Sequence, residues 1–320
     1  MSFRKTTVLV TGGAGFIGSH LVERLLEEGA RVRVMDDFST GARGNLAPAA
    51  GRVEVVEGSV TDAWTCRRAC EGVDYVLHQA ALPAVQRSVA APGVTHEVNA
   101  TGSLNVLMAA HQAGVRRVVY AGSSSAYGDT PTLPKHEAMP SFPRSPYAVA
   151  KLAGEHYAQC FPRLYGLETV VLRYFNVFGP RQDPASNYSA VIPLFIRKAL
   201  AGEAPTIHGD GEQTRDFTYI ENVVQANFQA CFAPADGVVG EVFNVGCGER
   251  ITVRRLWGEI REITGATVDA AHGPPRPGDV RDSLADLGKI RDRLGYEVVV
   301  PLTEGLRRTV RWVRDAAPAG

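Results

Sequence analysis

A glycine-rich turn between a strand-like segment and a helix-like segment constrains the fold of this chain more than any other feature. Residues Thr7 to Val10 are β-branched or aliphatic, as in a buried parallel strand. The turn, residues 11–18 (TGGAGFIG), leads into a helical stretch from Ser19 to Glu28, and a second strand runs from Arg31 to Met35. Later strand-like segments also alternate with helical ones, so we expect a doubly wound parallel sheet.

Three glycines of this turn, Gly12, Gly15 and Gly18, favour a dinucleotide site. Glycine permits the tight turn and lets the backbone approach a pyrophosphate at the N-terminus of the following helix. Asp36 ends the second strand, where an acid reaches the 2′-hydroxyl of a ribose. Asp36 and Asp37 would repel a 2′-phosphate and no arginine directly follows them, so NAD is favoured over NADP.

A second motif places a phenol beside an ammonium. Tyr147 and Lys151 are four residues apart in a stretch that reads as helix, and positions i and i+4 share one helix face. A nearby positive charge lowers the pKa of a tyrosine from about 10, so Tyr147 is a candidate base near neutral pH. The serines at 123–125 can share the substrate proton. Alone, the tetrapeptide is more often an accident of a helix surface, and the glycine turn favours the functional interpretation.

Glycines spaced three and three, with a later Tyr-x-x-x-Lys, resemble the short-chain dehydrogenase/reductase superfamily. The chain length and residues 11–18 resemble its extended branch, which mostly acts on nucleotide sugars, and within it the UDP-glucose/UDP-N-acetylglucosamine 4-epimerases. The resemblance runs from Thr7 to about Trp312. It implies a Rossmann-type α/β fold with a smaller α/β substrate lobe, bound NAD, a UDP-sugar substrate and a homodimer formed through two helices per subunit.

The composition of the chain excludes several classes of partner. The chain of 320 residues carries 34 acids and 34 bases with no single-sign block, which argues against nucleic acid. It shows no signal peptide or long apolar run, so we expect no membrane segment. Five scattered cysteines without a Cys-x-x-Cys pair indicate a cytoplasmic protein with no metal site.

We expect an NAD-binding domain over 1–175, with a return segment near 217–245, and a substrate lobe over 176–216 and 246–320.

The resemblance implies further cofactor contacts beyond the glycines and acids of the first unit. Tyr147 and Lys151 contact NAD in the family. Ser59 stands where the family often carries an aspartate that meets the adenine, and Asn99 matches a helix asparagine near the active site, although a buried structural amide is the alternative. The remaining expected cofactor residues are Phe16, Ile17, Ser39, Thr40, Gly41, Val60, Gln79, Ala80, Ala81 and Tyr174.

The resemblance also implies the substrate contacts. Two basic anchors, Arg215 and Arg276, are placed on the diphosphate, and an arginine fork suits that group. Each arginine taken individually is more often a surface ion-pair partner. Asp279 is placed on the ribose and Asn176 on a phosphate. The other expected substrate residues are Ala190 and Val191 at the uracil ring, Ser283 near the sugar C2 group, and Ser123, Ser125 and Tyr147 at the reacting carbon.

The residues after Ser123 bear on the reaction type. By the family pattern Ser123 is the catalytic hydroxyl, with Ser124 and Ser125 as alternative proton shuttles. The family's dehydratases carry an acidic pair just after this hydroxyl, and its decarboxylases typically carry a glutamate. Positions 124 and 125 hold no carboxylate that could promote loss of water, so simple 4-epimerisation is favoured. An NAD-dependent lyase and a non-catalytic NAD-binding regulator are the alternatives.

Two places bear on the sugar. Residues 182–188 look like those of the hexosamine-type epimerases. Ser283 matches a gate position where a bulky tyrosine would exclude an N-acetyl group, and serine leaves space for one. This favours UDP-GlcNAc and UDP-GalNAc, with UDP-glucose and UDP-galactose as further substrates. Arg181 could instead hold the carboxylate of a uronate, so UDP-glucuronate is an alternative.

Overall fold

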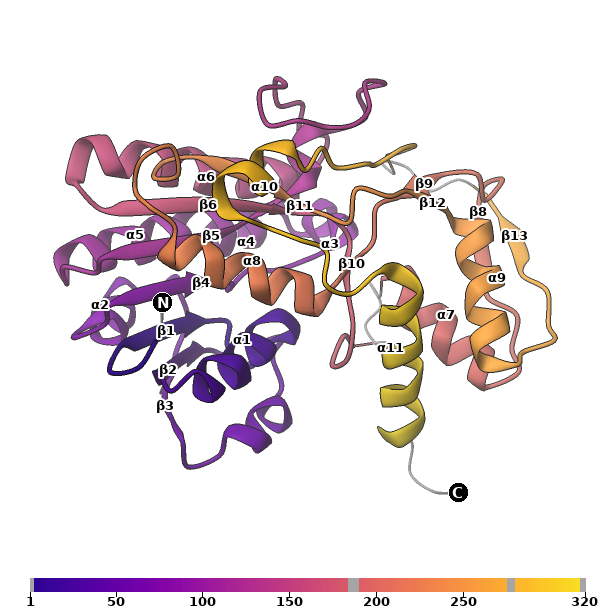
Figure 1. Cartoon of the computed structure of the whole chain (residues 1–320), viewed down its shortest axis with the longest axis horizontal. Coiled ribbons are helices and arrows are strands. Elements are labelled where there is room, and N and C mark those ends of the chain that lie inside the picture. The colour runs from indigo at the N-terminus through magenta and orange to yellow at the C-terminus, as the bar shows by residue number, and fades with distance from the viewer. Residues whose placement is uncertain (1–2, 184–189, 275–279, 317–320) are drawn as a thin grey trace.

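The protein is built on one seven-stranded parallel sheet, seen on the left of the computed structural model in Figure 1. The structure describes residues 3–183, 190–274 and 280–316. The strand order is β11-β6-β5-β4-β1-β2-β3, and every neighbouring pair is parallel, as the sequence predicts. The strands are β1 (Thr7–Thr11), β2 (Arg31–Asp36), β3 (Val53–Glu57), β4 (Tyr75–His78), β5 (Arg117–Ser123), β6 (Glu168–Tyr174) and β11 (Val242–Val245).

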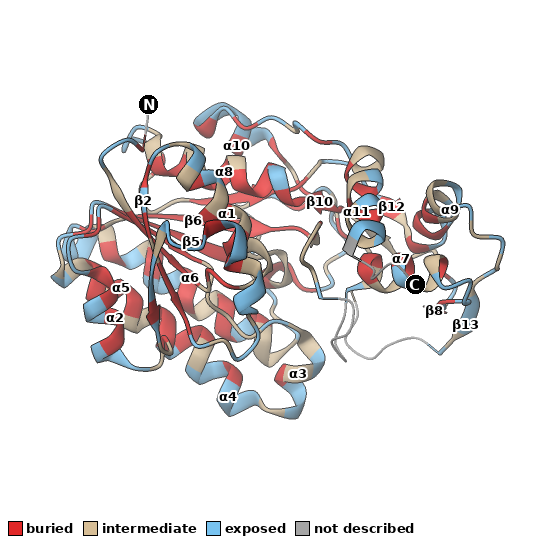
Figure 2. Ribbon diagram, turned by 90° about the horizontal axis from the view of Figure 1, so that it is seen from below, coloured by how far each residue is buried: buried red, intermediate tan, exposed pale blue. Residues whose placement is uncertain are grey.

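Alternation along the central strands builds two cores, one on each face of the sheet. Val8 and Val10 of β1 pack into one core and Leu9 into the other, because successive strand residues point to opposite faces. Figure 2 shows the buried strands between the covering helices. The first core is covered by α1 (Phe16–Glu27) and α8 (Ile220–Phe232), the second by α2 (Ala63–Cys70), α5 (Gly102–Gln112) and α6 (Pro146–Tyr165).

The order of the strands reverses between β1 and β4. The chain runs outward from β1 through β2 to β3, and then returns to β4 on the other side of β1. In open parallel sheets, ligands bind in the crevice outside the carboxyl ends of the strands at such a reversal. The glycine turn follows β1, so the fold places it at this crevice.

A second group of elements lies at the right of Figure 1. Its helices pack against one another, and Phe195 of α7 meets Trp257 of α9 edge to face at 5.5 Å. Three short strand pairs accompany these helices. None of the described helices of the chain combines the length and apolar character needed to cross a membrane. These elements are α7 (Val191–Leu200), α9 (Val253–Thr264), α11 (Leu302–Ala316), β7 (Val177–Phe178) with β10 (Thr218–Tyr219), β9 (Thr214–Arg215) with β12 (Ile251–Thr252), and β8 (Thr206–His208) with β13 (Ala271–Gly273).

The chain therefore leaves the large sheet after β6 and comes back to it with α8 and β11. We propose the domain division given above on this ground. The remaining elements are short: η1 (Arg43–Ala49), α3 (Val85–Ala90), α4 (Pro92–His96), η2 (Glu97–Thr101), η3 (Ser124–Tyr127) and α10 (Gly288–Leu294).

One helix boundary differs from the expected one, and one strand extends into the serine run. Helix α1 begins at Phe16 rather than Ser19, because Gly15 is extended (φ −78°, ψ 179°) and the helical backbone follows at once. Strand β5 continues to Ser123, which pairs with Tyr174 of β6. Ser123 is therefore held at the end of the sheet rather than in a loose loop.

Candidate active site

The glycine turn is shaped by the absence of side chains. Gly12 has a left-handed backbone (φ +67°), and a Cβ there would lie 2.8 Å from the Cα of Ala80. A Cβ on Gly18 would lie 2.1 Å from the carbonyl oxygen of Gly12. The N-cap of α1, Gly15, has no side chain that could cap the first amides. The turn thus leaves backbone N–H groups at a helix N-terminus for an anion, which fits the pyrophosphate of a dinucleotide.

Asp36 is fixed in position by the backbone around it. Its carboxylate accepts hydrogen bonds from the N–H of Ala14 and the N–H of Phe38, both at 2.8 Å. Burial raises the pKa of Asp36, and these two hydrogen bonds lower it. Asp37 accepts from both the N–H and the hydroxyl of Ser39, at 2.9 and 2.6 Å. Both acids therefore hold fixed positions at the end of β2, as recognition of a ribose requires.

The start of α6 positions the phenol and the ammonium. Ser145 caps the helix by accepting from the N–H of Ala148 at 3.1 Å, so Tyr147 and Lys151 lie in its first two turns. The Lys151 ammonium lies 4.8 Å from the ring centre of Tyr120 on β5. Across from α6, the hydroxyl of Ser123 is 2.8 Å from that of Ser125. The serine run and the Tyr-x-x-x-Lys motif thus lie at the carboxyl ends of the strands.

The ionisation of these groups differs from the expected one. We expected Lys151 to lower the pKa of Tyr147; instead burial raises it, and a hydrogen bond with Ser123 lowers it only in part. Burial also lowers the pKa of Lys151 to about 8, against the attraction of Glu155. Desolvation is therefore the largest influence on both pKa values, and Tyr147 is a neutral phenol on the same helix as a protonated lysine at neutral pH.

A buried hydrogen-bond chain that the sequence did not reveal joins β1 to β4. The hydroxyl of Thr11 lies 2.7 Å from Nδ1 of His78, and Nε2 of His78 lies 3.0 Å from the Ser103 hydroxyl. Ser103 donates to the carbonyl of Asn99 at 2.7 Å. Burial and Lys151 lower the pKa of His78 to about 3, so the ring is neutral. This order assigns the His78 proton to Nε2, with Thr11 donating to Nδ1.

Asn99 has a different place from the one expected. Its side-chain oxygen accepts from the N–H of Leu82 at 2.7 Å, and its amide donates to the carbonyl of Leu82 at 3.0 Å. Asn99 is fully buried and does not line the cavity. It holds the segment after β4 in place, which agrees with the alternative of a buried structural amide.

One cavity of about 1220 Å³ gathers most of the expected residues. It runs from the glycine turn past the serine run to the second group of elements. Ser59 and Val191 do not line it, and Arg276 and Asp279 lie outside the described residues. The expected residues that line it are Gly12, Gly15, Phe16, Ile17, Gly18, Asp36, Asp37, Ser39, Thr40, Gly41, Val60, Gln79, Ala80, Ala81, Ser123, Ser124, Ser125, Tyr147, Lys151, Tyr174, Asn176, Ala190, Arg215 and Ser283.

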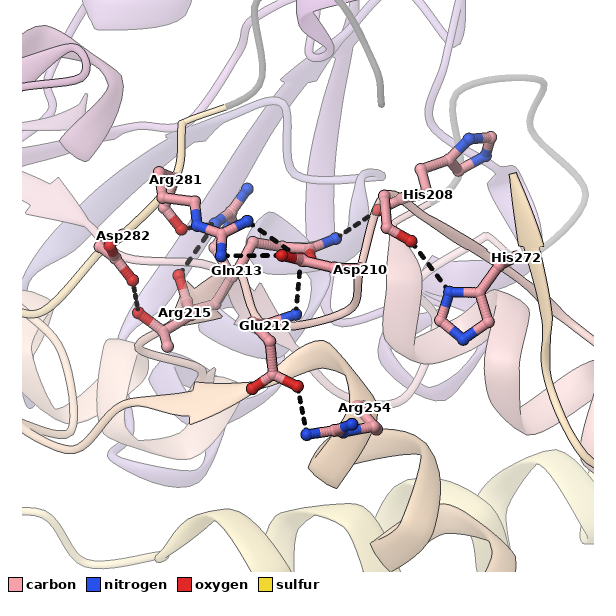
Figure 3. A network of polar contacts seen from close by, with 11 residues as sticks. His208, Asp210, Glu212, Gln213, Arg215, Arg254, His272, Arg281 and Asp282 are labelled. Atoms are coloured by element: carbon pink, nitrogen blue, oxygen red, sulfur yellow. Dashed lines mark hydrogen bonds and ion pairs between the residues drawn. The ribbon is translucent and has the colours of Figure 1, made fainter. Parts of the chain in front are cut away.

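The substrate end of the cavity is ordered by pairing between β9 and the segment that carries Ser283. The N–H of Ser283 donates to the carbonyl of Thr214 at 3.2 Å, and the Thr214 hydroxyl donates to Asp282 at 2.5 Å. Arg281 binds both oxygens of Asp210 at 3.0 Å, in the network of Figure 3. Arg215 and Ser283 are thereby held on neighbouring segments.

Several lining residues were not expected from the sequence. Lys135 is buried and donates to the hydroxyl of Thr130 at 2.6 Å, and Trp312 reaches the cavity from α11. Arg87 lines the cavity from α3. These positions belong to no short motif, so the sequence carried no local signal for them.

The family is shown by comparison with known proteins. The model of a family described as the NAD dependent epimerase/dehydratase family matches residues 8–246. The chain belongs to this family. NAD is its cofactor, and the glycine turn and the fixed Asp36 fit that dinucleotide.

Similar proteins cover the chain almost completely. A UDP-glucose 4-epimerase of Mycolicibacterium smegmatis is 40% identical, over 96% of this chain and 98% of its own. The crystal structure of a Thermotoga maritima UDP-glucose 4-epimerase with UDP-glucose has a TM-score of 0.92 at 40% identity, covering 97% and 99% of the two chains. A UDP-N-acetylglucosamine 4-epimerase of Methanobrevibacter ruminantium M1, in complex with UDP-N-acetylmuramic acid, has a TM-score of 0.92 at 38% identity, covering 98% and 100%. A dTDP-glucose 4,6-dehydratase of Streptomyces niveus is 35% identical over 96% of this chain and 93% of its own.

The ionisation of Lys151 predicts a pH-dependent stability. Its folded pKa of about 8 lies below the value of about 10.4 in an unfolded chain. Between these values the unfolded state binds the extra proton, so the free energy of unfolding of the wild-type protein rises with pH. Lys151→Met removes the group. The stability of the variant relative to the wild type should therefore fall by about 2 kcal/mol between about pH 7 and pH 9.5.

Urea unfolding of the NAD-free proteins at both pH values measures this difference. The packing effect of the substitution is independent of pH and cancels in the comparison. A difference that stays constant with pH would show that Lys151 keeps an ordinary pKa in the folded protein.

Proposed function

We propose that this protein is an NAD-dependent 4-epimerase of a UDP-hexose, with UDP-GlcNAc and UDP-GalNAc as the favoured pair and UDP-glucose and UDP-galactose as further substrates. The observation that carries the proposal is the position of Ser123, Tyr147 and Lys151 in one cavity with the glycine turn. This arrangement joins a hydroxyl, a phenol and an ammonium to a dinucleotide site.

The chemistry requires a proton and a hydride to leave the same carbon. When bound, NAD would supply reversible hydride transfer at C4 of the sugar. Tyr147 first loses its own proton to solvent, then takes the proton of the C4 hydroxyl, directly or through Ser123, and gives it back after the 4-keto sugar has turned over. Lys151 stabilises the phenolate, which burial by itself disfavours.

The lyase alternative lacks the groups that it needs. A 4,6-dehydration must remove a further proton from C5 and expel water from C6. Ser124 and Ser125 line the cavity directly after Ser123 and carry no carboxylate for these steps. The lyase reading would therefore need acid–base groups from elsewhere in the cavity. The non-catalytic regulator is disfavoured because the serine, tyrosine and lysine lie together.

The gate proposal concerns Ser283. This residue lines the cavity and is 9% exposed, and its backbone is tied to Thr214. A small side chain at this fixed place supports a substrate with a bulky C2 group. A similar protein is named a UDP-N-acetylglucosamine 4-epimerase, which supports the same substrate pair.

We also propose a homodimer in the cytoplasm. Apolar side chains are exposed on neighbouring helices: Val94 of α4 at 55%, and Val149 and Tyr157 of α6 at 51% and 41%. A second copy of the chain, packed through α4 and α6, would remove them from water. Sedimentation at micromolar concentration should give a dimer, and a monomer there would contradict the proposal.

The catalytic assignment predicts that Tyr147→Phe abolishes turnover and leaves NAD bound. The phenyl ring keeps the shape of the site and loses the proton-transfer group, so kcat should fall by about 10²- to 10⁴-fold. NMR of the purified proteins with UDP-GlcNAc follows the appearance of UDP-GalNAc, and absorbance after denaturation gives the NAD content. Retained activity in the variant would remove Tyr147 from the mechanism.

The gate predicts a selective loss. Ser283→Tyr should lower kcat/KM for UDP-GlcNAc by at least about tenfold relative to UDP-glucose, because the phenol fills the space of the N-acetyl group. Ser283→Ala is the matched control and should keep the wild-type ratio. An equal loss on both substrates would mean that Ser283 does not face the C2 group.

A further inference from the structure

An ion pair joins helix α1 to the segment after β7. The Nη2 of Arg181 binds both carboxylate oxygens of Glu23, at 2.7 and 2.6 Å. The two side chains are 16% and 25% exposed. Arg181 lines the same cavity as Ser123 and Tyr147, so a guanidinium that could meet the substrate is already paired with a carboxylate of the protein.

The pair is held from both sides. His20, one helical turn before Glu23 on α1, lies with Nε2 3.0 Å from the carbonyl of Pro180. Burial lowers the pKa of His20, so the ring is neutral and donates this hydrogen bond. Arg181 itself has a left-handed backbone (φ +66°), which is uncommon for a residue with a side chain. The His20–Pro180 hydrogen bond thus joins the two segments that carry Glu23 and Arg181.

The electrostatic result is a neutral pair with one unused donor group. Nη1 of Arg181 is buried and has no hydrogen-bond partner among the described residues. Its burial closes this nitrogen to a substrate carboxylate while the pair is intact. A carboxylate that came to the guanidinium would also stand close to Glu23, and like charges at short range in a partly buried site repel strongly. Without Glu23, the same guanidinium would offer a two-point site for a carboxylate.

We propose that Glu23 is a specificity-determining residue: its carboxylate occupies Arg181 in place of a C6 carboxylate, so the cavity favours neutral hexoses over uronates. The inference rests on the proposed function and deepens its substrate class. In this proposal Arg181 pairs with Glu23 in the wild-type protein, and it can bind a uronate only when Glu23 is removed.

The test is Glu23→Gln, which removes the charge and keeps the side-chain shape. The ratio of kcat/KM for UDP-glucuronate to that for UDP-glucose should rise by about tenfold or more, as one gained charge-assisted contact implies. Glu27→Gln is the matched control on the same helix, because Glu27 is exposed and pairs only with the surface residue Arg24 at 3.6 Å among the described contacts. It should leave the ratio unchanged. The double variant Glu23→Gln/Arg181→Met should lose the gain.

Calorimetric titration of the NAD-loaded proteins with UDP-glucuronate gives a readout that needs no turnover. Glu23→Gln should bind this ligand about tenfold more tightly than the wild type; equal affinity would overturn the proposal. If Glu23→Gln fails to fold, Glu23→Ala carries the same comparison, because it also removes the charge that occupies Arg181: tighter uronate binding than in the wild type supports the proposal, and equal affinity overturns it. A wild-type protein that epimerises no UDP-hexose would refute the proposed function, while the affinity comparison would still test Glu23.

Discussion

The close approach of the backbone after β1 to the backbone after β4 is the constraint on which the site depends. Gly12 lies so near Ala80 that a Cβ would come within 2.8 Å of its backbone. The Thr11–His78 hydrogen bond joins the same two strands beneath the contact. Because the strands meet in this way, α1 starts directly over the crevice and the segment after β4 borders the cavity. A side chain at Gly12 would separate the two halves of the cofactor site.

Burial sets the charge state of the catalytic residues. It raises the pKa of Tyr147 and lowers that of Lys151, so both groups tend toward neutrality. Glu155, one turn after Lys151, opposes this for the lysine. It is itself paired with Arg173 of β6, whose Nε lies 2.9 Å from its carboxylate. The carboxylate that supports Lys151 is therefore balanced by a second buried cation.

The sequence predicted the sheet, the glycine turn and the cluster of Ser123, Tyr147 and Lys151, because each depends on neighbours in the chain or on a strand end. It did not predict the Thr11–His78–Ser103 chain or the Glu23–Arg181 pair, whose members meet only through the fold. The prediction that the pKa of Tyr147 is lowered was wrong for a related reason. Spacing on a helix indicates a nearby charge, but it does not indicate how far the side chain is removed from solvent. Patterns along the chain predict where a site residue lies, whereas its protonation state depends on burial and on partners that are distant in the sequence.

In the proposed reaction, one hydride leaves C4 of the sugar and returns to the same carbon. UDP-GlcNAc labelled with deuterium at C4 tests this step, with the equilibrium mixture followed by NMR in ordinary water. We expect UDP-GalNAc that keeps its deuterium at C4, because the label never exchanges with solvent. Loss of the label to water, or a second run in D₂O that places deuterium at C3 or C5, would mean that the protein works through proton removal from carbon and would rule out the proposed hydride transfer.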